Sequence, residues 1–163
     1  MTKSSQRNSD ILDWTEPARP NEPNEPNEPN EPSDELDAVV RLTLGAAIEV
    51  HRCLGPGFVE SVYEAAMCIE LERRGIAYEQ QVRAPVIYKG VVVGEHFIDL
   101  IVEGSLIVEL KCAAAFAPVH LAQTLSYLKA KDLRVGLLLN FQMRRLNDGG
   151  IKRVVNGARR ASA

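Results

Sequence analysis

The sequence has few cysteines and no long apolar segment. Its three cysteines, Cys53, Cys68 and Cys112, are scattered and odd in number, which fits neither a disulfide framework nor a zinc or iron–sulfur site. No apolar run approaches the roughly 18 to 20 residues of a membrane-spanning helix, and the polar start offers no secretion signal. We therefore expect a cytoplasmic protein with no membrane association.

Motifs for nucleotide phosphates and for single strands are also missing. Gly55-Pro56-Gly57 has neither a preceding strand nor the G-x-x-x-x-G-K-S/T spacing, so hydrolysis of nucleoside triphosphates is not expected. Aromatic residues make up 6% of the chain and form no series interleaved with basic residues, as single-strand binders use.

The 163 residues, 45% hydrophobic and 25% charged, have the size and composition of one soluble globular domain. Their net charge of −3 is unevenly distributed. Residues 1–32 carry three basic and seven acidic side chains, and the remaining 131 residues carry 16 and 15. From Phe141 to the end the local charge is +5, which indicates a solvated basic tail or, less commonly, an edge that contacts phosphate.

Three segments follow from composition. Residues 1–32 contain four copies of Asn-Glu-Pro, and regularly spaced proline with repelling glutamates predicts a disordered, solvated arm without a catalytic role. Residues 33–157 form the predicted globular domain. Residues 158–163 form a basic C-terminal tail.

Hydrophobic spacing predicts the element order ααββββαβα within the globular domain, an α/β or α+β fold with a mixed central sheet flanked by helices. Ser33 is the expected cap of the first helix, and Gly75 ends the second. The expected helices cover 33–54, 58–74, 118–129 and 148–155, and the expected strand segments cover 76–88, 91–93, 97–102, 106–112 and 133–141.

A hairpin in this sheet carries the residues most suited to chemistry. Asp99 interrupts one apolar strand, and Glu109 and Lys111 interrupt its partner on a shared face. If the connection is residues 103–105, facing residues have numbers that sum to 208, which sets Asp99 opposite Glu109. A two-residue turn would shift this register by one.

Two adjacent carboxylates repel one another unless a cation or a proton intervenes. Mg²⁺ suits such a pair because it takes oxygen ligands and needs one or two protein carboxylates, and Mn²⁺ is an expected substitute. Lys111 could then orient the attacking water or offset charge on a phosphate. The alternative is a structural ion-pair cluster, the more common explanation of an isolated match of this length.

Two helices offer further side chains toward the hairpin. Glu60 and Tyr63 share a helix face with Glu64 and Met67, and Gln123 and Tyr127 lie one turn apart on the third helix. Individually they are typical of a solvent-facing glutamate, half-buried tyrosines and a surface glutamine. Only their joint occurrence around the hairpin favours a site.

Several ordered blocks resemble the GxxExxY family. Residues 57–63, GFVESVY, match its G-x-x-E-x-x-Y signature, and the resemblance covers nearly all of residues 36–156. Further matching blocks are VIYKGVVVGEHFIDLIVEGSLIVELK, HLAQTLSYLKA, LRVGLLLNF and NDGGIKRVV.

That family resembles the PD-(D/E)XK nuclease superfamily, which implies a role for each matching residue. Asp99 would be the motif aspartate, here preceded by Ile98 instead of proline, and Glu109 and Lys111 the E-x-K pair. The resemblance makes Glu60 a further metal ligand and places Gln123 and Tyr127 near the site or the nucleic-acid backbone. The carbonyl of Leu110 would be available as another ligand.

The function implied is a small Mg²⁺-dependent nuclease that acts on DNA in preference to RNA. The alternative is a catalytically silent nuclease-like fold that serves as a binding or assembly module. A nearly neutral core predicts weak autonomous binding of nucleic acid. A protein partner, or a second copy of the chain as in a homodimer, could therefore supply charge and target choice.

Overall fold

A computed structural model describes residues 33–157, so the predicted disordered arm (1–32) and basic tail (158–163) lie outside the described residues. The described part is an α+β domain with a five-stranded mixed sheet, which confirms the predicted fold class. Its elements in chain order are α1 (Asp34–Leu54), α2 (Glu60–Arg73), β1 (Tyr78–Tyr88), β2 (Val91–Val102), β3 (Leu106–Lys111), α3 (Pro118–Lys131), β4 (Val135–Asn140) and β5 (Ile151–Val155).

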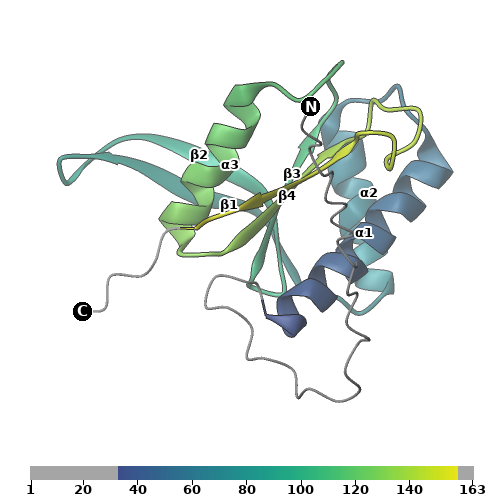
Figure 1. Cartoon of the computed structure of the whole chain (residues 1–163), viewed down its shortest axis with the longest axis horizontal. Helices are drawn as coiled ribbons and strands as arrows, with labels where there is room; N and C mark the ends of the chain where they lie inside the picture. Colours follow the sequence, from purple (N-terminus) through teal and green to yellow (C-terminus); the bar gives the residue numbers. More distant parts are fainter. Residues whose placement is uncertain (1–32, 158–163) are drawn as a thin grey trace, which may run out of the picture. The chain divides into compact units, whose positions relative to one another are not determined.

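The sheet lies between two helical layers, with α1 and α2 on one face and α3 on the other (Figure 1). Its strand order is β1-β2-β3-β4-β5, and only β3 and β4 run parallel. That parallel pair is connected through α3, as parallel neighbours require. The larger core cluster joins α1 and α2 to the sheet, and the smaller one includes Tyr127 and Leu128 of α3.

The first helix begins and ends where the sequence predicts. The side chain of Ser33 accepts a hydrogen bond from the amide of Leu36 at 3.3 Å, and acidic residues occupy the first turn. Gly55 ends the helix at φ 66°, a conformation that favours glycine. Among the described residues, no helix is long and apolar enough to cross a membrane.

The predicted strand segments 91–93 and 97–102 form one strand, so three strands, and not four, precede α3. Gly94 does not interrupt β2, because its backbone pairs with Val86 of β1. The turn at Lys89 and Gly90 has positive φ at both residues, as predicted for a tight hairpin. The tip of this hairpin extends beyond α3 and exposes the side chains of Ile87, Tyr88, Val91, Val92 and Val93 (Figure 1).

The prediction of a last helix at residues 148–155 is wrong. Residues 151–155 form β5, which pairs antiparallel with β4 from Val135↔Val155 to Leu139↔Ile151. The β-branched residues of this segment suit a strand, and the outer edge of β4 supplies partners that a short isolated helix would lack. The observed order is therefore ααβββαββ.

Candidate active site

The hairpin of β2 and β3 has the predicted register. Residues 103–105 connect the strands, and Leu100 faces Val108, so facing residue numbers sum to 208. Glu103 and Gly104 adopt φ values of 50° and 62°, which turn the chain within this short loop. The paired ladder ends at Leu100 and Val108, one residue before the two carboxylates.

Beyond that point, side chains join the two strands. The amide of Asp99 donates to Oε1 of Glu109 at 3.1 Å, and the amide of Leu110 donates to Oδ2 of Asp99 at 2.8 Å. Each carboxylate is therefore fixed by a backbone amide of the opposite strand. This exchange holds one oxygen of each group and brings Asp99 and Glu109 together at a single strand junction.

Burial makes the carboxylate pair electrostatically unusual. Glu109 is 3% exposed, and burial, followed by the charge of Asp99, raises its pKa to about 8. Burial is also the main reason that the pKa of Asp99 is raised, and the hydrogen bond from Leu110 opposes the increase. The pair therefore favours a proton or a cation close to its oxygens.

Lys111 is the cation nearest to Glu109 on the same strand face. Its Nζ lies 4.0 Å from Oε2 of Glu109, and its side chain is 21% exposed. The ammonium group thus lies partly open to solvent beside a buried carboxylate. Such a position suits contact with an approaching anion and agrees with the spacing prediction for Glu109 and Lys111.

The two glutamates of α2 have different environments. Glu60 is exposed, and its Oε1 accepts a hydrogen bond from the amide of Cys112 at 3.1 Å, directly after Lys111. Glu64 is 9% exposed and accepts hydrogen bonds from the amide groups of Gln80 and Gln81. Of the two, Glu64 is the one whose charge raises the pKa values of the strand carboxylates.

Gln81 connects Glu64 to the carboxylate pair. Its Nε2 lies 2.9 Å from Oε2 of Glu64 and 3.3 Å from Oδ1 of Asp99. Sequence reasoning did not assign Glu64, Gln80 or Gln81 to the site. Glu64 carried a usable signal, because it follows Glu60 by four residues on one helix face, whereas the glutamines are brought in by strand pairing.

Tyr63, the tyrosine of the G-x-x-E-x-x-Y pattern, is fully buried and shapes the loop before α2. Its hydroxyl donates to the carbonyl of Gly55 at 2.5 Å and accepts from the amide of Phe58 at 3.3 Å. Its ring stacks on Phe141 with 4.4 Å between centroids. These contacts place the first turn of α2, and therefore Glu60, against the end of β3.

The third helix lies on the carboxylate side of the sheet. Burial, followed by the charges of Glu109 and Asp99, raises the pKa of Tyr127 to about 12, while a hydrogen bond with Gln123 lowers it. Gln123 and Tyr127 also line a surface pocket together with His96. The structure thus brings Tyr127 near the pair, with Gln123 beside it on the same side of α3.

The chemistry of the donor set fits a divalent cation. Asp99 and Glu109 offer hard carboxylate oxygens, which Mg²⁺ and Mn²⁺ prefer, and the charge of nearby Glu64 adds to the negative potential at the pair. In the conformation described for residues 33–157, no three His, Cys, Asp or Glu side chains are close enough to hold an ion together. Glu60 in particular is occupied by the amide of Cys112.

The carboxylate pair, the E-x-K strand and the mixed sheet are together typical of a nuclease-like class of protein. A family model described as the PD-(D/E)XK nuclease superfamily matches residues 37–154, and the chain belongs to that superfamily. Nucleases of this superfamily typically use divalent metal ions. Comparisons with curated proteins and with solved structures gave no significant match.

Proposed function

We propose that this protein is a Mg²⁺-dependent nuclease that hydrolyses phosphodiester bonds, with DNA as its preferred substrate. The observation that carries the proposal is the junction beside Lys111, where the amide of Asp99 donates to Glu109 and the amide of Leu110 donates to Asp99. Asp99 and Glu109, with the carbonyl of Leu110, would hold the cation. When bound, the cation would neutralise phosphate charge and lower the pKa of a water.

The chain's own groups have separate tasks in this scheme. The amides of Asp99 and Leu110 orient the carboxylates, so little rearrangement is needed when substrate arrives. The partly exposed ammonium of Lys111 stabilises negative charge on the phosphate and can hydrogen-bond the attacking water. We assign Glu64 and Gln81 to positioning of Asp99, and Gln123 and Tyr127 to contact with the substrate.

We keep Glu60 among the proposed metal ligands, but with only one of its two carboxylate oxygens. Since Oε1 accepts from the Cys112 amide, Glu60 anchors the segment that follows Lys111, and Oε2 is the oxygen with which it would bind the cation. The role of Glu60 is therefore mainly positioning, and ligation through Oε2 would be its lesser contribution.

The direct test is cleavage of labelled single- and double-stranded DNA and RNA by the full chain in Mg²⁺, Mn²⁺ or EDTA. We expect cleavage of DNA that requires metal and falls roughly 100-fold or more in Lys111→Ala. Lys129→Ala, which removes an exposed lysine of α3, is the matched control and should cleave like the wild type. Tight binding without cleavage in either metal would replace the nuclease with a silent binding module.

A further inference from the structure

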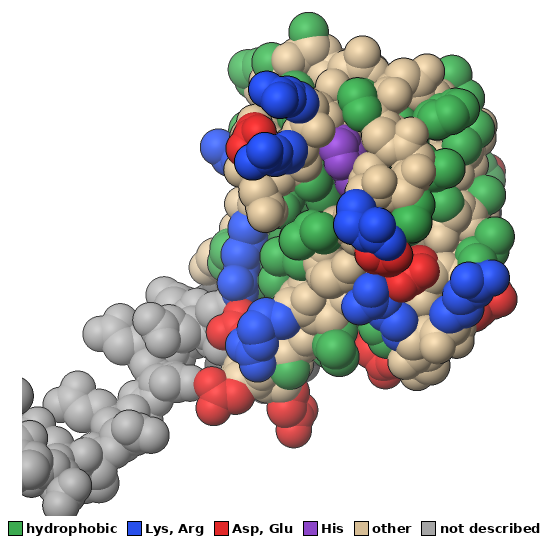
Figure 2. Space-filling view, turned by 90° about the vertical axis from the view of Figure 1, so that its right-hand side faces the viewer, with side chains coloured by type: hydrophobic (Ala, Val, Ile, Leu, Met, Phe, Trp, Pro, Cys, Tyr) green, Lys and Arg blue, Asp and Glu red, His purple; other side chains and the backbone are tan. Residues whose placement is uncertain are grey.

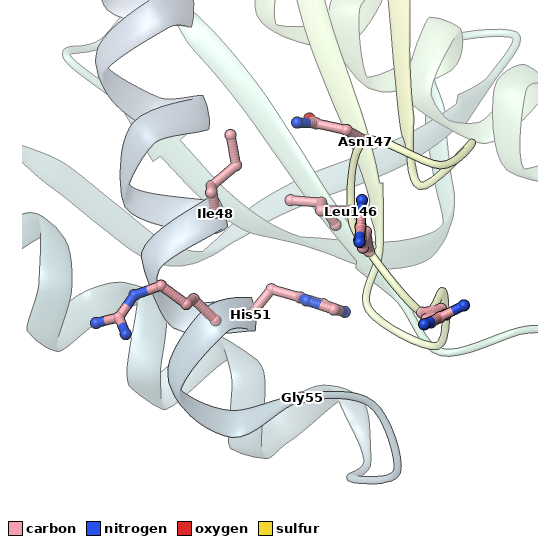
Figure 3. A pocket seen from close by; sticks show the side chains of 8 residues that line it. Ile48, His51, Gly55, Leu146 and Asn147 are labelled. Atoms are coloured by element: carbon pink, nitrogen blue, oxygen red, sulfur yellow. The ribbon is translucent and has the colours of Figure 1, made fainter.

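A concave site lies apart from the carboxylate pair, between the end of α1 and the loop that connects β4 to β5. This pocket has a volume of about 370 Å³. Ile48, His51 and Gly55 form one wall, and Leu146 and Asn147 face them from the loop (Figure 3). Arg52, Arg144 and Arg145 complete the lining.

The positive charge of this pocket is only partly compensated. Arg52 donates two hydrogen bonds to Glu49, at 2.7 and 2.8 Å, so its charge is matched within α1. Arg144 and Arg145 are exposed and form no ion pair within residues 33–157. Figure 2 shows a histidine on this face of the molecule, with lysine and arginine side chains at several places on both sides of it and acidic side chains among them. Two arginine charges therefore remain available to an anion.

The walls of the pocket are fixed before any ligand arrives. His51 is 7% exposed, and its Nε2 carries the proton, because it lies 2.8 Å from a carbonyl oxygen, that of Met143, which can only accept. The opposite wall is held by buried Leu146, whose carbonyl accepts from the amide of Gly150 at 2.8 Å. Binding would order the exposed side chains of Arg144, Arg145 and Asn147, whereas His51 and Leu146 are already held, which limits the entropic cost.

Hydrogen bonds connect the loop between β4 and β5, which carries Arg144 and Arg145, to the end of β3, the strand that carries Lys111. The amide of Phe141 donates to the carbonyl of Lys111 at 2.9 Å. The buried side chain of Asn140 donates to the carbonyl of Ala113 and accepts from the amides of Ala113 and Gln142. The pocket and the candidate active site thus border the same end of the parallel pair of β3 and β4.

We propose that the pocket binds a backbone phosphate of the nucleic-acid strand, away from the bond that is cleaved. This inference rests on the proposed function and extends it to how the substrate is held. Guanidinium groups match phosphate oxygens in geometry and charge, and backbone contacts fix the register of a nucleic acid without reading its sequence. The pair of arginines supplies local charge that the nearly neutral domain otherwise lacks.

The test is binding of fluorescent single- and double-stranded DNA to the full chain in EDTA, where metal-dependent cleavage cannot occur. Arg144→Gln/Arg145→Gln should weaken binding about tenfold and reduce the slope of log affinity against log salt by about one to two. Arg41→Gln/Arg73→Gln removes two exposed arginines of α1 and α2 and is the charge-matched control. Unchanged thermal midpoints establish that each variant is folded.

The outcomes separate this inference from the nuclease proposal. Weakened binding in the pocket variant alone supports the phosphate site even if the wild type never cleaves DNA. Equal losses in both double variants would overturn the inference, because general charge would then explain binding. A second result would also overturn the inference. In that result, inorganic phosphate or a nucleoside monophosphate competes with DNA for the wild type, but Arg144→Gln/Arg145→Gln binds DNA as tightly as the wild type does.

Discussion

Glu109 is the residue whose environment departs most from that of an ordinary surface acid. Folding raises its pKa from 4.5 to about 8, so between these values the folded protein keeps a proton that the unfolded chain has released. The stability that this proton contributes is fully present below pH 4.5 and is lost as the pH rises through about 8.

We therefore expect Glu109→Gln to gain stability relative to the wild type as pH increases in metal-free buffer. The difference should grow by up to about 1.4 kcal/mol per pH unit between about pH 5 and pH 8. Chemical denaturation at several pH values measures it. A constant difference across this range would show that Glu109 titrates like an exposed acid.

The two glutamates of α2 give a second prediction at the residue scale. Glu64→Gln should weaken the affinity for Mn²⁺ more than Glu60→Gln does, because Glu64 is coupled to Asp99 through Gln81. Loss of a residue that orients a metal ligand through hydrogen bonds typically lowers metal affinity about 10- to 100-fold. Calorimetric titration of Mn²⁺ into both variants would measure their affinities. A larger loss of affinity in Glu60→Gln than in Glu64→Gln would contradict the prediction.

At the scale of elements, the loop between β4 and β5 depends on a close backbone approach at Gly150. A Cβ at this position would lie 2.7 Å from the carbonyl oxygen of Leu146 and 2.8 Å from that of Asn140. Gly150→Ala should therefore cost about 1 to 3 kcal/mol of unfolding free energy. Gly157→Ala, where nothing lies within 4 Å, is the control and should change stability little.

Elements also show what the sequence could predict. Local signals sufficed for α1, because its cap, charge pattern and final glycine act within a few residues of one another. The hairpin register followed from alternation and loop length, so Asp99 and Glu109 could be paired in advance. The assignment of 148–155 failed because β5 is stabilised by β4, a partner that no local pattern reveals.

The same distinction applies to the candidate site. Residues on one strand or one helix face, such as Glu109 with Lys111, could be grouped by spacing alone. Gln81 could not, because its place beside Asp99 and Glu64 requires β1, β2 and α2 to be assembled. The different roles of Glu60 and Glu64 likewise depend on tertiary packing at the end of β3.

At the scale of the whole molecule, a cation bound between the strands should stabilise the fold. The carboxylate pair belongs to β2 and β3, so a ligand that binds only the folded state raises the thermal midpoint by mass action. At 100 times its dissociation constant, a cation would add about 2.7 kcal/mol. Thermal scans of the wild type with Mn²⁺, Mg²⁺ or neither measure this gain, and equal midpoints at saturating metal would refute it.

The central claim is that Asp99 and Glu109 hold a divalent cation. Isothermal titration of Mn²⁺ into the wild type, Asp99→Asn and the control Glu79→Gln tests it most directly, because Glu79 is an exposed acid of β1. We predict one site in the wild type and the control, with affinity reduced at least about tenfold in Asp99→Asn. Equal affinity in all three proteins would contradict the claim.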